Sequence, residues 1–457
     1  MPTTGDFGIV GVVIDAPVRG ELRIRDRALV VVDDTGRIAE VLGRDAETYD
    51  TVRDHLADRG RLTELSDGQF LLPGLVDLHN HAPQWPQLGK ALDVPLEVWL
   101  NRYTFPLEAR YADVGFAATV YESLIDSMLA NGTTTAVYFA TTHLAATERL
   151  VDICLDKGQR ALVGKVAMDH PDGCPDFYRD DSAASGIDET AQLADYIAQH
   201  PTNGDGLVLP AITPRFIPSC TDELLSGLGE LVQRTGLHVQ THCSESDWAH
   251  EYGLKRFGQS DTKTYNDFGL LTSKTVLAHS NFVSATDLDL LADTGASVAH
   301  CPLSNVFFAN AVFPLREAFA AGVHVGLGTD ISGGPSPSIF SAAGGAVVAS
   351  RVREDGVDAT LSATGRGTAG SRISFAEAFW AATTGGGLAL DLPIGELSPG
   401  YSFDAIVVDS TVADADLMIW PRLDSPVDIL QKIINNATRR NVTGVWVQGK
   451  AVGTVAP

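Results

Sequence analysis

The feature that most constrains the fold is a regular alternation of strand-length and helix-length segments between residues 71 and 329. Eight short, mostly apolar runs have the length of buried strands: 71–79, 133–139, 161–168, 206–212, 237–242, 275–279, 296–300 and 323–329. Amphipathic stretches of helical length lie between them, at 113–130, 145–158, 187–200, 222–235, 248–257, 284–294 and 311–321. Eight strands that alternate with helices predict an α/β fold, a (β/α)8 TIM barrel.

The two ends of the chain have a different pattern. The runs 8–14, 22–32 and 37–42 are apolar and β-branched, with turn residues between them, and 394–410 and 442–452 return to this pattern. Such runs predict short strands joined by turns. We therefore expect a small β-sandwich domain built from both chain ends. Its N-terminal part is predicted at residues 1–70 and its C-terminal part at 391–457, with the barrel inserted at 71–390.

Charge and composition narrow the range of partners. The chain has 33 Lys and Arg against 58 Asp and Glu, a formal net charge of −25. So acidic a surface repels nucleic acid and anionic membranes, so neither is expected as a partner. The first residues do not resemble a signal peptide, and no apolar run approaches the ~20 residues of a membrane span. Five scattered cysteines without a CxxC pair form no disulfide framework. We expect a cytoplasmic protein.

Histidines and one aspartate stand where predicted barrel strands end. They are His79, His81, His242, His279 and Asp330. Active sites of such barrels lie at the carboxyl ends of the strands. A lone His-x-His pair could equally be two hydrogen-bonded core histidines, but five such residues at strand ends favour a metal site. Imidazoles with one carboxylate suit zinc or a similar first-row ion, which would activate a water molecule.

Glu245 lies three residues after His242 and is the candidate general acid–base. The alternative is an exposed carboxylate at the start of the helix at 248–257, where the helix dipole would favour it. Asp330 is expected both to ligate the ion and to accept a hydrogen bond from the attacking water. His300 also ends a strand, but we predict that it either supports the ligands from behind or has a structural role. Lys165 is expected to be a salt-bridged barrel lysine rather than a metal-bridging carbamate.

Longer motifs resemble the amidohydrolase superfamily, in its mononuclear deaminase branch. They are PGLVDLHNHAP at 73–83, THCSE at 241–245, LAHS at 277–280, AHCPLSN at 299–305 and GLGTD at 326–330. Within it, the segments 81–111, 164–169, 213–220, 241–246 and 328–334 resemble the guanine deaminase family. These motifs include HAPQ, TPRF and GTDISGG, and the resemblance spans the whole chain.

The resemblance implies specific roles. Zinc, one ion per subunit with Fe²⁺ possible, would be held by the five residues named above, and Glu245 would carry protons. Gln84 and Arg215 would bind the polar edge of a purine, and Phe216 would pack on its ring. The implied reaction is hydrolytic deamination of guanine to xanthine and ammonia by a metal-bound hydroxide, within purine catabolism. In it, Glu245 protonates N3 and then the amine, and Asp330 takes the second proton. A homodimer is also implied.

Two segments, at 85–92 and 304–319, depart from the family pattern and are expected to border the pocket, and HSNFV at 279–283 also differs from that pattern. They leave open a related substrate: 8-oxoguanine, a pterin or an aminotriazine. A non-catalytic scaffold on the same barrel is a minor alternative, because such proteins typically lose metal ligands and every candidate ligand is present here.

Overall fold

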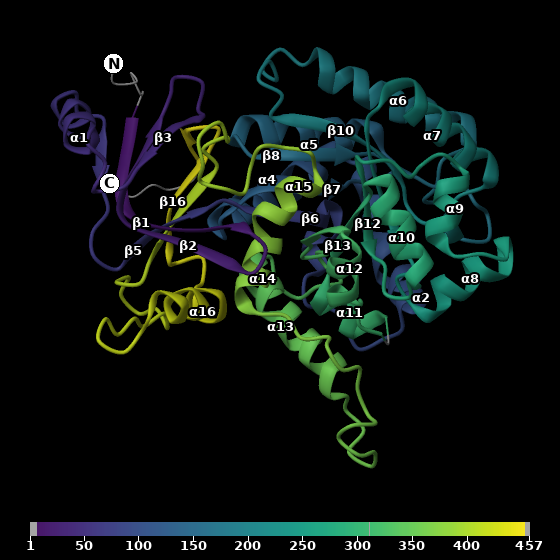
Figure 1. The fold of residues 1–457 in the computed structure, drawn as a ribbon. Coiled ribbons are helices and arrows are strands. Elements are labelled where there is room, and N and C mark those ends of the chain that lie inside the picture. The colour runs from purple at the N-terminus through teal and green to yellow at the C-terminus, as the bar shows by residue number, and fades with distance from the viewer. Residues whose placement is uncertain (1–6, 310, 453–457) are drawn as a thin grey trace.

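The body of the protein is a barrel of parallel strands surrounded by helices (Figure 1). This computed structural model describes residues 7–309 and 311–452. The barrel strands are β6 (Leu75–His81), β7 (Thr133–Phe139), β8 (Arg160–Gly164), β10 (Val208–Pro214), β11 (His238–Cys243), β12 (Thr275–His279), β13 (Ser297–His300) and β14 (His324–Leu327). A short strand, β9 (Val166–Ala167), follows β8 and pairs with β10. Residues beyond β14 close the barrel, because Asp330 N donates to His79 O (2.8 Å) and His81 N donates to Ile331 O (3.0 Å). The predicted TIM barrel is confirmed.

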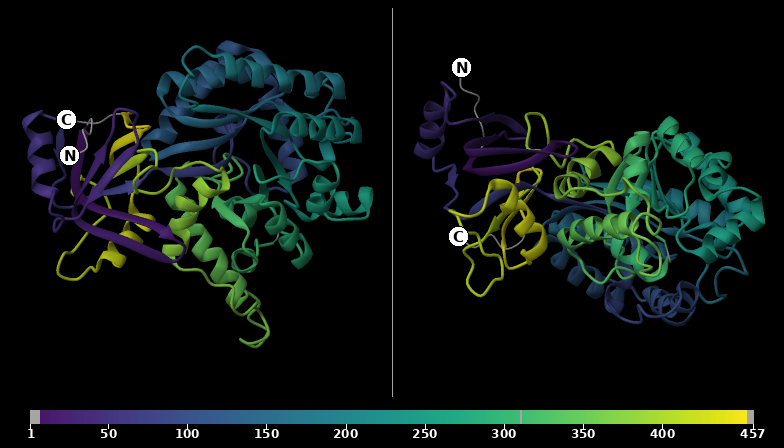
Figure 2. Two further views of the ribbon diagram at one scale, coloured as in Figure 1. Left: turned by 45° about the horizontal axis from the view of Figure 1, so that its top comes forward. Right: turned by 60° about the horizontal axis from the view of Figure 1, so that its bottom comes forward.

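Helices cover the outside of the barrel in the predicted order (Figure 2). They are α4 (Val114–Ala130), α5 (Leu144–Lys157), α6 (Ala183–Gln199), α7 (Asp222–Thr235), α8 (Asp247–Phe257), α9 (Asp261–Asp267), α10 (Ala285–Thr294), α11 (Pro302–Phe308), α12 (Leu315–Ala321), α13 (Ile339–Asp355), α14 (Phe375–Ala382) and α15 (Thr384–Ala389). Local signals set several ends: Ser284 and Asp287 form a capping box at the start of α10, and left-handed Gly295 ends it. No helix in the described ranges is long and apolar enough to cross a membrane.

A second sheet is built from both ends of the chain, as predicted. Its strands, in spatial order, are β17 (Lys450–Ala451), β16 (Val442–Val447), β15 (Ala405–Asp409), β5 (Gln69–Pro73), β1 (Phe7–Val18), β2 (Glu21–Val32) and β3 (Ile38–Leu42), and β4 (Leu62–Glu64) pairs with β1. Helices α1 (Tyr49–Asp58) and α16 (Pro426–Asn436) also lie in these terminal segments. The central pairing of β5 with β1 and β15 joins the N-terminal and C-terminal strands.

The predicted strand at 71–79 was wrong in one respect, because the structure divides it into two strands. Residues up to Pro73 belong to β5 in the second sheet, and β6 begins the barrel at Leu75. Gly74 lies between them, where a Cβ atom would stand 2.1 Å from Thr134 Oγ1. Only glycine allows that approach, so the chain passes from one sheet to the other at this residue.

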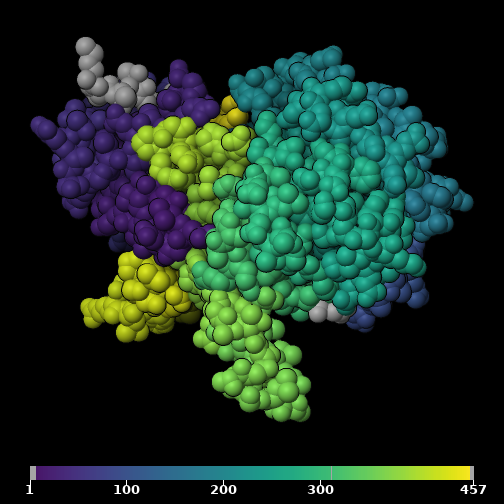
Figure 3. Space-filling model, turned by 45° about the vertical axis from the view of Figure 1, so that its right-hand side comes forward, coloured from purple at the N-terminus to yellow at the C-terminus, as the bar shows by residue number. Residues whose placement is uncertain are grey.

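Two further segments carry structure that the sequence pattern did not predict. Residues 82–112 form short turns of helix: η1 (Ala82–Gln87), α2 (Leu96–Trp99), η2 (Leu100–Thr104), α3 (Phe105–Glu108) and η3 (Ala109–Ala112). Prolines recur in this stretch, and proline interrupts helical hydrogen bonding, so one long helix is disfavoured. The end of α13 and the loop after it project from the body as an arm (Figure 3).

Candidate active site

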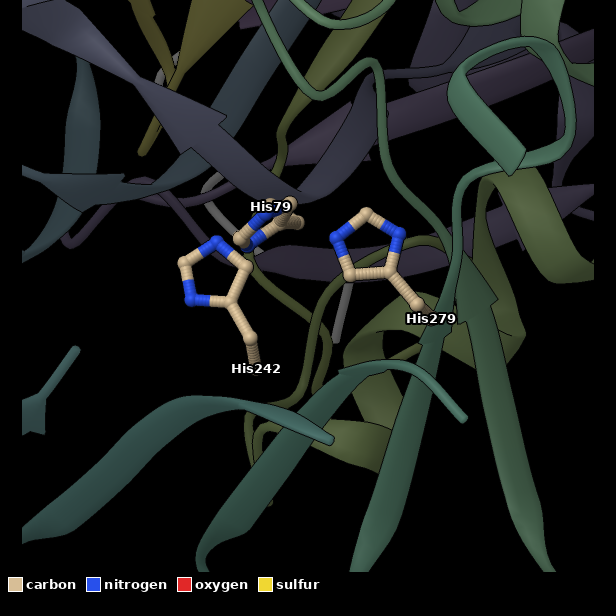
Figure 4. Close-up of side chains that lie close together, drawn as sticks. All are labelled: His79, His242 and His279. Carbon is tan, nitrogen blue, oxygen red and sulfur yellow. The ribbon is translucent and has the colours of Figure 1, made fainter. Parts of the chain in front are cut away.

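The five predicted metal ligands come together at the carboxyl end of the barrel strands. His79 and His81 end β6, His242 lies on β11, His279 ends β12, and Asp330 follows β14, and all five are buried. Figure 4 shows the rings of His79, His242 and His279 directed toward one another. Their ligand atoms lie within 4.8 Å of one another, as do those of His79, His81 and Asp330. The two groups share His79, so the five side chains lie around one centre.

The backbone at two of these positions is strained in a way that helps to aim the side chains. His279 has φ of 69° and Asp330 has φ of 47°, in the left-handed region that non-glycine residues rarely adopt. Such a conformation costs on the order of 1 kcal/mol or more and persists where the surroundings enforce it. At His279 it coincides with the end of β12, and at Asp330 it lies in the loop that follows β14.

Hydrogen bonds fix which nitrogen of two imidazoles faces the centre. His242 Nδ1 donates to the Arg215 carbonyl at 2.6 Å, and His279 Nδ1 donates to Asn305 Oδ1 at 2.9 Å. Each bond holds the proton on Nδ1 and leaves the lone pair of Nε2 free. Asn305 was not singled out in the sequence, although it lies within the AHCPLSN motif.

Several buried nitrogen and oxygen atoms of the site have lone pairs with no hydrogen-bond donor beside them. Burial lowers the pKa of His79, His81 and His242, so these rings are neutral. Within the described chain, Nε2 of His79 and Nε2 of His279 are buried without a hydrogen-bond partner. Nε2 of His81 and Nε2 of His242 face each other at 2.9 Å, and Asp330 Oδ1 lies 3.3 Å from His79 Nε2. Buried acceptors without donors are costly, and a divalent cation would satisfy them together. The residues fit a zinc-like ion.

Glu245 is part of this cluster and is not an exposed helix-start carboxylate. Its side chain is buried, Oε1 lies 3.6 Å from His279 Nε2, and helix α8 begins later, with Ser246 as its N-cap. Burial, reinforced by the charge of Asp330, raises the pKa of Glu245 to about 8. Asn281 Nδ2 donates to the Glu245 carbonyl at 2.9 Å and so holds the backbone of this residue. A buried acid with a raised pKa beside a candidate metal site suits proton transfer.

A narrow cavity extends from the ligands. Its apolar walls are formed by Leu96, Trp99, Leu100, Phe216 and Phe308. The rings of Trp99 and Phe308 lie 5.2 Å apart, and Phe216 lies 6.2 Å from the His242 ring. Of the two segments expected to border the cavity, 304–319 contributes Phe308. The expectation for 85–92 was wrong, because Trp85 turns away to bond Ser123, and Ala91 and Leu92 pack behind the walls.

Gln84 and Arg215 form a second polar end of the cavity lining, distinct from the candidate ligands. A third residue, Glu108 of α3, holds them. Its carboxylate accepts from Arg215 Nη1 at 2.5 Å, from Arg215 Nη2 at 3.1 Å and from Gln84 Nε2 at 2.9 Å. Burial by itself lowers the pKa of Arg215, but the charge and hydrogen bonds of Glu108 raise it overall. Glu108 was missed in the sequence, although it lies in the quoted segment 81–111.

His300 and Lys165 have the structural roles predicted for them. His300 is buried against Phe313, and burial lowers its pKa to about 3. It belongs to no candidate ligand group within residues 7–309 and 311–452. Lys165 Nζ lies 2.5 Å from Asp180 Oδ1 and 3.2 Å from Glu189 Oε2, a buried ion pair.

Comparison with known proteins agrees with this geometry. A model of the Amidohydrolase family matches residues 70–452. The chain is 37% identical over 452 residues to the probable guanine deaminase of Schizosaccharomyces pombe, covering 97% of this chain and 82% of that protein. It is 35% identical over 436 residues to the guanine deaminase of Homo sapiens, covering 94% and 92%. A crystal structure of guanine deaminase from C. acetobutylicum, with guanine bound in the active site, matches with a TM-score of 0.86 and 29% identity over 98% of this chain and 99% of that one.

Proposed function

Since this chain belongs to the amidohydrolase family, and within it is related to guanine deaminases along almost its whole length, we propose that it hydrolyses guanine to xanthine and ammonia. The observation that carries the proposal is one buried cavity with two chemically different ends. Four imidazoles and two carboxylates meet at one end, and hydrogen-bond donors line the other. A planar aminopurine between apolar walls would have its amino-bearing carbon at the first end.

The proposed metal is zinc, with Fe²⁺ as the alternative. It would be held by His79, His81, His242, His279 and Asp330. Such an ion, when bound, supplies Lewis-acid activation of water near neutral pH. The support is the set of buried, neutral imidazoles whose Nε2 atoms converge.

Glu245 is the proposed proton carrier. Its burial and its position 3.6 Å from His279 allow it to take a proton from the attacking water. It would then protonate ring atom N3, which makes C2 electrophilic, and finally the departing amine. Asp330, close to His79 and His81, would take the second proton of the water, and this proton would pass to Glu245, which delivers it to the departing amine so that ammonia leaves.

Gln84, Arg215 and Phe216 are the proposed substrate contacts. The amide and guanidinium N–H groups would donate to acceptors on the purine, and Phe216 would pack on its face. We also propose a cytoplasmic homodimer acting in purine catabolism, supported by the resemblance to guanine deaminases.

The deciding experiment is ammonia release from guanine by the purified, zinc-replete protein, with 8-oxoguanine, a pterin and an aminotriazine in parallel. We expect guanine to be turned over fastest. Slow release from guanine with fast release from another ring would keep the mechanism and change the substrate. If no ammonia is released from any of these rings and the purified protein retains no metal, the result would support the scaffold alternative.

A further inference from the structure

Glu108 lies behind the polar end of the cavity, and its chemistry restricts the two residues in front of it. Its side chain is fully buried and does not line the cavity, whereas Gln84 and Arg215 do. A carboxylate at the centre of three short hydrogen bonds acts only as an acceptor. Both partners must therefore use N–H donors toward it.

The orientation of the Gln84 amide follows without ambiguity. On one side Nε2 lies 2.9 Å from the Glu108 carboxylate, and on the other Oε1 accepts from Ser332 N at 3.0 Å. A backbone N–H can only donate, so reversing the amide would break both bonds. The Gln84 carbonyl oxygen is thus directed at the Ser332 backbone, and the second N–H of Nε2 remains to donate to a ligand.

Arg215 is restricted in the same way. Two of its N–H groups point to Glu108, and its guanidinium lies 5.0 Å from the Phe105 ring, which limits how its plane can turn. Arginine has five N–H donors and no acceptor, so what Arg215 offers the cavity is again a donor.

We propose that Glu108 is a positioning residue that makes this end of the cavity donor-only, so that the enzyme selects a ring edge carrying acceptors and rejects an exocyclic amino group there. The inference rests on the proposed function and narrows its substrate class to oxo-purines. An amino group at that edge would place N–H against N–H and leave buried donors unpaired, which sites of this kind discriminate against strongly.

The test uses two bases that lack the 2-amino group and so compete with guanine without being substrates for the proposed reaction: hypoxanthine, with a 6-oxo acceptor, and adenine, with a 6-amino donor. For the unmodified chain we expect the inhibition constant of hypoxanthine to be at least about tenfold lower than that of adenine. In Glu108→Gln, which keeps the shape but lets residue 108 also donate, we expect the ratio to fall to within about threefold. KM for guanine should rise more than kcat falls, with metal content unchanged.

A matched control separates positioning from loss of stability. Asp404 accepts from Arg160 Nε at 3.0 Å and Nη2 at 3.2 Å, a second buried carboxylate–arginine pair that lies away from the cavity. Asp404→Asn should lower the melting temperature as Glu108→Gln does and leave the hypoxanthine-to-adenine ratio as in the unmodified chain. Glu108→Asp keeps the charge and should retain the preference for hypoxanthine. If Glu108→Gln does not fold, the two inhibition constants are measured in Glu108→Asp instead.

The outcomes distinguish this inference from the function on which it rests. An unmodified chain that releases no ammonia from guanine rejects the proposed function. Turnover of guanine with an unchanged ratio in Glu108→Gln, an equal change in Asp404→Asn, or equal inhibition of the unmodified chain by adenine and hypoxanthine rejects only the role of Glu108.

Discussion

The two ends of the cavity handle buried charge in opposite ways. At the polar end, the carboxylate of Glu108 is matched by the guanidinium of Arg215, one charge against one charge, with two hydrogen bonds between them. At the other end, Glu245 and Asp330 are buried among imidazoles that burial keeps neutral, and the pKa of each carboxyl is raised. The charges and hydrogen bonds of the first end are balanced. The second end has more hydrogen-bond acceptors and acidic groups than donors.

This difference fits the proposed division of roles, in which the end with Glu108 and Arg215 (the recognition end) would bind the ring edge and the end with Glu245 and Asp330 (the reactive end) would carry out the reaction. A balanced pair holds its groups rigidly and has no reason to exchange protons, which suits recognition of a ring edge. An acid-rich, donor-poor cluster is costly until a cation enters, and that cation brings reactivity. Variants at the two ends should therefore fail in different ways.

The largest effect is expected from removing a ligand at the reactive end. His242→Ala removes the ring whose Nε2 faces His81, and it should leave the protein with little bound metal and with turnover at background. Metal analysis measures the bound metal, and ammonia release from guanine measures turnover. His300→Ala, at a buried histidine outside the ligand groups, should retain the metal. Full metal content in His242→Ala would contradict the ligand assignment.

Glu245→Gln should separate proton transfer from metal binding. It keeps the size of the side chain and removes its proton, so metal content should be normal while kcat falls by roughly 10²–10⁴. Steady-state kinetics on metal-replete protein gives the comparison. Near-normal kcat would exclude Glu245 as the proton carrier.

Arg215→Ala should damage the recognition end in two measurable ways. KM for guanine should rise by roughly ten- to a hundredfold, the scale of a lost charged hydrogen bond, and stability should fall by about 3–5 kcal/mol because Glu108 is left buried without a partner. The double variant Arg215→Ala/Glu108→Gln should regain part of the stability and none of the affinity. Recovery of KM in the double variant would show that Arg215 does not contact the substrate.

The residues of the reactive end could be predicted from sequence because each lies at or just after the end of a barrel strand. In a parallel barrel every strand ends on the same face, so His79, His242, His279 and Asp330 needed only the strand pattern to be brought together. The alternation of strands and helices also predicted the barrel. Apolar runs separated by turn residues predicted the second sheet. Pro73 and Gly74 interrupt the apolar run in the sequence, but the change of sheet at Gly74 was missed because it shows only in the pairing of β5 and β6 with different strands.

The recognition end could not be predicted in the same way. Gln84, Glu108 and Arg215 come from a 3-10 turn, a one-turn helix and a strand-end loop, and no periodicity relates their positions. Motif resemblance indicated Gln84 and Arg215, but the residue that joins them emerged only when distances were known. Asn305 is a similar case, since its contact with His279 depends on where a seven-residue helix packs.

Asn305 therefore offers the smallest and most specific test at the reactive end. Its Oδ1 accepts from His279 Nδ1 at 2.9 Å and keeps the Nε2 lone pair directed at the ligand cluster. In Asn305→Ala the proton of His279 is free to move to Nε2, so metal affinity or kcat should fall by about ten- to a hundredfold, the usual scale for losing such an orienting bond. Asn305→Asp keeps an acceptor in place and should lose less. A metal titration followed by ammonia release compares the two, and equal losses in both variants would mean that packing of α11, rather than the hydrogen bond, orients His279.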